Sequence, residues 1–155
     1  MALWLPWRSR PPVTKLAFDY LPIAAATSIR SATCTAYVWR PAKGVLVSRV
    51  EGCFSDEAAT LLEAKVRSCV AMDGSLLGIH DWWETTDYVT SARTRLTGLA
   101  VDLRRTTEAI HILTQSRLIT LAVQTANLAV RNITAYSERG PFERFLQTTI
   151  RTRQR

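Results

Sequence analysis

The clearest alternation of hydrophobic and polar positions begins at Thr33, where Cys34, Ala36 and Val38 alternate with Thr35, Tyr37 and Trp39. A period of two residues is typical of a half-buried β-strand. A turn-forming run at 41–44 and a more apolar strand at 45–50 follow, so this part of the chain predicts a β-hairpin. Short apolar runs predict three further strands at 76–79, 110–113 and 133–136.

Four other stretches carry the helical period. The first begins at Ser55, a favourable N-cap, and is followed by Asp56 and Glu57, whose negative charge suits the start of a helix. Its apolar residues recur every three or four positions until the chain reaches 73–74. The same reasoning predicts helices at 92–103 and 116–128, and a last one that starts near Pro141.

The order of elements is therefore strand, strand, helix, strand, helix, strand, helix, strand, helix. Successive strand–helix–strand units require parallel pairing with right-handed crossovers, so helices must cover the sheet. The sequence predicts an α/β domain with a single mixed, mostly parallel sheet of about five strands covered by about four helices. We expect a flexible N-terminal extension at 1–12, one domain at 13–150 and a basic C-terminal tail at 151–155. Trp4 and Trp7 belong to that extension, or they contact a membrane surface.

Composition and charge exclude several classes of protein. The chain has 155 residues, 47% of them hydrophobic, which excludes intrinsic disorder and fits one globular domain. The net charge is +7, but five arginines lie near the two ends; without them 15 basic residues face 13 acidic ones, which disfavours nucleic-acid binding. Three cysteines without CxxC spacing indicate a reducing, cytoplasmic environment and no disulfide framework. No apolar stretch is long enough to cross a bilayer.

Candidate binding chemistry follows the carboxyl ends of the predicted strands, where ligands of open α/β sheets gather. If the three later strands are neighbours, their loops share one rim. The binding or switch candidates on these loops and on the helix starts are His80, Asp81, Trp82, Trp83, Tyr88, Thr90, Ser91, Ser116 and Arg117. The chain carries no GxSxG, GxGxxG or P-loop motif, and no cofactor is predicted.

Each group of candidates has two interpretations. His80 is a hydrogen-bonded residue at a strand end and Asp81 caps the next turn, or both join His111 in a metal site. The aromatic residues of the first loop are Trp82, Trp83 and Tyr88. They cover the core, or they form the wall of a pocket in which Arg117 or Arg139 binds an anionic group. The hydroxyl candidates at helix starts are Thr90, Ser91 and Ser116. They are N-caps, or they accept a phosphoryl group there.

The order of elements, Asp81 at a strand end and the run Val89-Thr90-Ser91-Ala92 about ten residues later together resemble the STAS domain. This is the fold of bacterial anti-sigma-factor antagonists and of the cytoplasmic portion of anion transporters. In the antagonists a partner kinase phosphorylates a Ser of an Asp-Ser-Ser-Gly motif and switches binding off. Here Thr90 and Ser91 preserve the hydroxyls, whereas Val89 and Ala92 replace the Asp and the Gly. The resemblance covers about residues 33–150, and it includes an uncharacterised bacterial branch of STAS-like proteins.

The resemblance implies a non-enzymatic regulatory module that binds a protein partner through the rim around 81–91 and is switched by modification at a helix start. The alternative is a small-ligand or lipid-binding domain that uses the Trp-rich loop. A metal-dependent hydrolase that uses His80, Asp81 and His111 is the third hypothesis. Apolar surface in 13–30 is a candidate homodimer interface.

Overall fold

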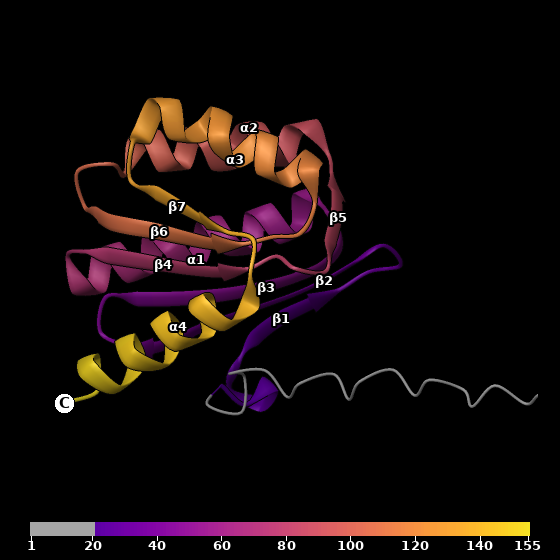
Figure 1. The fold of residues 1–155 in the computed structure, drawn as a ribbon. Coiled ribbons are helices and arrows are strands. Elements are labelled where there is room, and N and C mark those ends of the chain that lie inside the picture. The colour runs from indigo at the N-terminus through magenta and orange to yellow at the C-terminus, as the bar shows by residue number, and fades with distance from the viewer. Residues whose placement is uncertain (1–20) are drawn as a thin grey trace, which may run out of the picture.

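The computed structural model describes residues 21–155 (Figure 1). The extension predicted at 1–12, with Trp4 and Trp7, lies outside the described residues. The strands are β1 (Thr27–Arg30), β2 (Cys34–Ala42), β3 (Val45–Phe54), β4 (Leu76–Asp81), β5 (Thr85–Tyr88), β6 (Thr107–Leu113) and β7 (Ile133–Tyr136). The helices are the short 3₁₀ turn η2 (Ile23–Ala25), α1 (Asp56–Asp73), α2 (Thr90–Asp102), α3 (Arg117–Val130) and α4 (Arg139–Arg153).

The strands of residues 21–155 form one mixed sheet in the order β1-β2-β3-β4-β6-β7. The β1–β2 and β2–β3 pairs are antiparallel, and the β3–β4, β4–β6 and β6–β7 pairs are parallel. The predicted fold class is thereby confirmed, with seven strands in place of about five.

The two additional strands lie where the hydrophobic pattern gave no strand signal. β5 occupies the second half of the predicted loop WWETTDY and pairs with the end of β3, beyond the residues of β3 that pair with β4. A register shift at Gly52–Cys53 accompanies this change of partner. Because β5 is four residues long and half exposed, its sequence shows no apolar alternation.

The ends of helix α1 follow the signals in its sequence. The Ser55 Oγ accepts a hydrogen bond from the backbone N–H of Ala58 at 3.2 Å, as expected of an N-cap. Gly74 ends the helix in the left-handed conformation with φ 77°, which a residue without Cβ adopts at little cost. The helix predicted from Ser55 to 73–74 is confirmed.

Helices cover both faces of the sheet (Figure 1). One face packs against α1, α2 and α3, with buried side chains such as Phe54, Leu62 and Leu99, and with Ile119 and Val123 of α3. The other face packs against α4; its core includes Trp39, Ile79, Leu113, Phe142 and Leu146. The sheet therefore separates two apolar layers, and successive residues of a strand enter different layers.

The C-terminal helix differs from its prediction at both ends. Helix α4 begins at Arg139, two residues before Pro141, and runs to Arg153. Residues 151–153, predicted as a basic tail, are thus part of the helix, and Arg153 Nη2 lies 2.5 Å from Glu108 Oε2 on β6. Within residues 21–155, no helix is long and apolar enough to cross a membrane.

Candidate functional site

The carboxyl ends of β4, β6 and β7 lie side by side, as the sequence predicts. Asp81 pairs in register with Leu113, and Leu113 with Tyr136. Two hydrogen bonds join the loops that leave these strands: Trp82 N–H donates to the Leu113 carbonyl at 2.9 Å, and Gln115 Nε2 donates to the Trp83 carbonyl at 3.1 Å. The three predicted loops therefore share one rim.

His80 and Asp81 enter opposite layers because they are neighbours in a strand. The Asp81 carboxylate is on the α4 side, where Arg139 Nη1 lies 3.3 Å from Oδ2. Its Oδ1 accepts the Trp83 N–H at 3.0 Å, so the prediction that Asp81 caps the following turn is confirmed. The Arg139 guanidinium also lies 5.2 Å from the centre of the Trp83 ring. Trp83 and Arg139 thus stabilise the rim on the α4 face.

His80 lies on the opposite face and is 6% exposed. Its Nδ1 is 2.7 Å from Ser48 Oγ, which also accepts a hydrogen bond from Trp82 Nε1 at 3.2 Å. The His80 and Trp82 rings stack with their centres 5.3 Å apart. Burial, with a smaller contribution from nearby His111, lowers the pKa of His80 to about 3, so its imidazole is neutral at physiological pH. The interpretation of His80 as a hydrogen-bonded residue near a strand end is confirmed.

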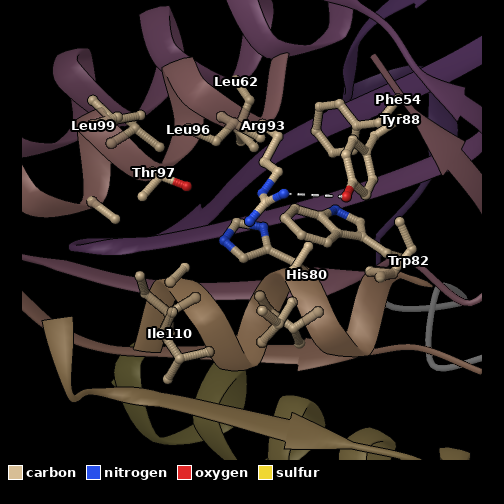
Figure 2. A pocket seen from close by; sticks show the side chains of 18 of the residues that line it. Phe54, Leu62, His80, Trp82, Tyr88, Arg93, Leu96, Thr97, Leu99 and Ile110 are labelled. Carbon is tan, nitrogen blue, oxygen red and sulfur yellow. Dashed lines mark hydrogen bonds between the residues drawn. The ribbon is translucent and has the colours of Figure 1, made fainter. Parts of the chain in front are cut away.

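An apolar cavity of about 130 Å³ lies between the sheet and the helices α1, α2 and α3. Most of its lining is aliphatic, and His80, Trp82, Tyr88 and Arg93 gather at one end (Figure 2). The Arg93 guanidinium reaches over this end, with Nη1 3.5 Å from Tyr88 Oη. Of the three aromatic residues predicted to wall a pocket, Trp82 and Tyr88 line this cavity, whereas Trp83 lies on the other face.

The arginine at this cavity is not one that the sequence indicated. Arg139 pairs with Asp81 on the other face, and Arg117 lines a separate shallow hollow with Thr114, Gln115 and Ser137. Arg93 was missed because it is an exposed position in the predicted helix, with nothing in its neighbours to mark it. The feature of the sequence that could have indicated Arg93 was its position five residues after Tyr88, whose hydroxyl it approaches in the structure.

The hydroxyl candidates have different roles at the two helix starts. Ser116 is the N-cap of α3, and its Oγ accepts the Ile119 N–H at 3.4 Å. In α2 the N-cap is Val89, which offers no side-chain acceptor, and Thr90 and Ser91 occupy the first turn. The Ser91 Oγ donates to Asp56 Oδ1 at 2.7 Å on an exposed surface. Of the three hydroxyls, only that of Ser116 caps its own helix.

The proposed metal ligands do not come together. His80 lies among α1–α3, and Asp81 lies beside Arg139. His111 stacks on Phe145 of α4, with ring centres 3.9 Å apart, and its Nδ1 is 3.0 Å from Tyr136 Oη. In the part of the chain from 21 to 155, no three His, Cys, Asp or Glu side chains are placed to hold a metal ion.

Solved structures share this architecture. An uncharacterised protein of the DUF3478 family with a SpoIIAA-like fold, from Shewanella loihica, superimposes with a TM-score of 0.53 at 15% identity over 79% of this chain and 92% of that chain. An anti-sigma factor antagonist from Mycobacterium paratuberculosis gives a TM-score of 0.51 at 17% identity over 79% of this chain and 99% of that chain. The protein has a STAS-like fold. No family model matches the sequence, and no curated protein resembles it in sequence.

The resemblance seen in the sequence is therefore confirmed for the fold. In this STAS-like domain the rim after β4 leads through β5 into α2, and Thr90 and Ser91 open that helix. These two hydroxyls stand at the helix start where the antagonist motif was expected, and Ser91 contacts the first residue of α1.

Proposed function

We propose that this STAS-like protein is a non-enzymatic regulatory module that binds a protein partner through the rim around 81–91 and the start of α2, and that modification of Ser91 switches this binding. The observation that carries the proposal is the exposed hydrogen bond from Ser91 Oγ to Asp56 Oδ1 at 2.7 Å. It joins the starts of α1 and α2, so a change at Ser91 alters the surface that both helices present.

A phosphoryl group on Ser91 would turn this contact from attraction into repulsion. The modified side chain no longer donates a hydrogen bond to Asp56, and it adds a charge of about −1.5 to −2 beside the Asp56 carboxylate. At the same time, the first turn of α2 offers unpaired backbone N–H groups that favour a negative charge. The expected result is a local shift of the phosphoryl group away from α1 and toward the start of α2, with the fold intact.

Ion pairs farther along the two helices keep α2 in place when its first turn changes. Arg95 Nε lies 3.3 Å from Glu63 Oε2, and Arg95 also contacts Thr60 of α1. Arg67 of α1 reaches both Glu63 and Asp102, the last residue of α2. The change at Ser91 is therefore confined to the rim, where the partner is proposed to bind.

The proposal is tested with a partner captured from the native host and then measured quantitatively. Its affinity is compared for the wild type, for Ser91→Ala and for the double variant Thr90→Asp, Ser91→Asp. Since like charges brought together at an interface cost several kcal/mol, we expect the double variant to bind at least about tenfold more weakly. The alanine variant removes the hydrogen bond without adding charge, and we expect a loss of about threefold or less.

Unchanged affinity in the double variant would show that the rim around Ser91 is not the switch. Thr148→Asp on α4 adds one negative charge at an exposed position on the opposite face of the sheet; it controls for added charge away from the rim and should bind like the wild type. Mass spectrometry of the protein from its own host supplies an independent check, because the proposal expects an added phosphoryl group on the Thr90–Ser91 peptide. All three cysteines of the chain are free thiols, which supports action in a reducing compartment such as the cytoplasm.

A further inference from the structure

One ring nitrogen of His80, in the lining of the cavity under α2 and α3, has no hydrogen-bond partner in the part of the chain that the structure describes. His80 Nδ1 is paired with Ser48, but no side chain or backbone group within 21–155 forms a hydrogen bond with Nε2. The ring is more than nine-tenths buried and belongs to the lining of the cavity (Figure 2). This nitrogen is therefore available to form a hydrogen bond with a molecule that enters the cavity.

The hydrogen bonds around Ser48 determine which nitrogen of His80 carries the proton. The Ser48 Oγ accepts a hydrogen bond from Trp82 Nε1. The hydroxyl proton of Ser48 can then be donated to His80 Nδ1, which lies 2.7 Å from Oγ. If Nδ1 were protonated, both the Ser48 proton and the Nε2 lone pair would be left unpaired. With Nε2 protonated, a single group is left unpaired, and this arrangement is favoured because each buried unpaired group is costly. His80 Nε2–H is therefore a hydrogen-bond donor that faces the cavity.

The rest of the lining restricts what can accept this hydrogen bond. Most of it is aliphatic and offers no polar partner, for example Leu76, Ile110 and Val123. The other uncharged polar groups of the lining are the hydroxyls of Thr97 and Thr107, and that of Thr107 donates to the Leu103 carbonyl at 2.9 Å. A charged group placed among the aliphatic residues would lose its hydration; the imidazole is neutral, and the charge of Arg93 lies at the exposed end of the cavity, away from the aliphatic part. The cavity volume of about 130 Å³ is close to that of an engineered apolar cavity of about 150 Å³ that binds benzene.

We propose that this cavity binds a small, neutral, mainly apolar molecule that carries one acceptor oxygen, and that His80 Nε2–H donates a hydrogen bond to that oxygen. A ring or short branched chain fills the aliphatic part. Tyr88 and Arg93 stand where the cavity meets the surface. The cavity shares Trp82 and Tyr88 with the protein-binding rim proposed above, but its test requires no protein partner.

The test uses two probes of nearly the same shape, acetophenone and isopropylbenzene. Acetophenone has a carbonyl oxygen that accepts a hydrogen bond, whereas isopropylbenzene has a methyl group in its place. The affinity of each probe is measured by NMR titration of the wild type and of His80→Leu. Comparing the same probe between two proteins cancels the different cost of removing each probe from water.

We expect His80→Leu to weaken acetophenone binding about tenfold and to leave isopropylbenzene within about twofold of the wild type. Ala126→Phe, which fills the cavity from α3, should abolish binding of both probes. Benzoate, a charged molecule of similar shape, should bind the wild type more weakly than acetophenone. Failure of the wild type to bind acetophenone, an equal loss for both probes in His80→Leu, or tighter binding of benzoate would overturn the proposal.

A measurement on the wild type keeps the test valid if a variant does not fold. The chain has two histidines, and nitrogen-15 NMR distinguishes a protonated from an unprotonated ring nitrogen in each. We expect the His80 ring to carry its proton on Nε2 and the Nε2 signal to shift when acetophenone is added. A protonated Nδ1, or an Nε2 signal that acetophenone leaves unchanged, would contradict the assignment of His80 as the donor.

Discussion

Substitution of Gly78 by alanine tests how tightly the His80 ring is held. A Cβ at position 78 would lie 2.7 Å from His80 Nε2, and the three atoms nearest to it all belong to the His80 ring. Because an unstrained contact of this kind is about 3.5 Å, the ring must move by nearly 1 Å. The 2.7 Å hydrogen bond between His80 and Ser48 cannot survive such a movement at its present length.

The expected loss of stability follows from these two effects. Overpacking a well-packed site costs about 1–3 kcal/mol, and losing one hydrogen bond costs about 1 kcal/mol. The cavity beside the ring gives it room to move, so the two effects do not add fully, and we expect a total of about 1–3 kcal/mol. For a domain of this size, that corresponds to a decrease of about 2–10 °C in Tm.

The assay is a double-mutant cycle measured by urea and thermal unfolding. In a His80→Ala background the ring is absent, and the added methyl group meets no clash with it. There Gly78→Ala should be neutral, or it should stabilise by up to about 1 kcal/mol, because alanine restricts the unfolded chain. The reasoning is refuted if Gly78→Ala changes the free energy of unfolding by the same amount, within about 0.5 kcal/mol, in both backgrounds.

Three further predictions concern charged and titrating groups. Arg139→Leu leaves the buried Asp81 carboxylate without its ion-pair partner, and urea unfolding at pH 7 should show a loss of about 1–3 kcal/mol, whereas Arg144→Leu, on an exposed position of the same helix, should have little effect. Burial holds the pKa of His80 at about 3, so between about pH 6.5 and pH 3 the unfolded chain binds a proton that the folded protein does not. The contribution of His80 to stability should therefore fall as the pH decreases through this range, and the wild type should lose more stability than His80→Leu. The Arg40 guanidinium holds the pKa of Asp73 well below its usual range, so this pair stabilises the fold at neutral pH and its contribution decreases as the pH falls below about 4. Urea midpoints should accordingly separate wild type from Asp73→Asn at pH 7 and converge toward pH 2.

Two results would contradict the pH predictions. If the wild type and His80→Leu show parallel stability curves between pH 4.5 and pH 6.5 (about the range where histidine titrates in the unfolded chain), His80 is not buried in its neutral form. If Asp73→Asn is as destabilising at pH 2 as at pH 7, its effect comes from packing and not from the ionised carboxylate.

Signals that lie within one segment of sequence determined most of the fold. Ser55 and Gly74 define the two ends of α1, and the spacing of apolar residues between them defines its buried side. The alternation of strands and helices from there to β7 then leaves little choice of topology, because parallel crossovers are right-handed. For this reason the fold class and the shared rim of β4, β6 and β7 were predictable.

The strands β1 and β5 depended on tertiary structure. Each has four residues, at least half of them exposed, and each exists because it pairs with one neighbour, β1 with β2 and β5 with the end of β3. Edge strands of this kind gain their stability from the hydrogen bonds of that pairing, and the hydrophobic pattern that identifies a buried strand is absent.

The chemistry of the site likewise depended partly on local sequence and partly on tertiary structure. The sequence indicated that His80, Asp81 and the aromatic residues follow β4, and strand alternation places His80 and Asp81 on opposite faces. It did not indicate that Ser48 pairs with His80 or that Ser91 pairs with Asp56, because these partners are 32 and 35 residues apart. Those contacts depend on the register of β3 against β4 and on the packing of α2 against α1, and neither is encoded in a local pattern of residues. The protonation state of His80, and the cavity that it faces, were therefore decided by the tertiary structure.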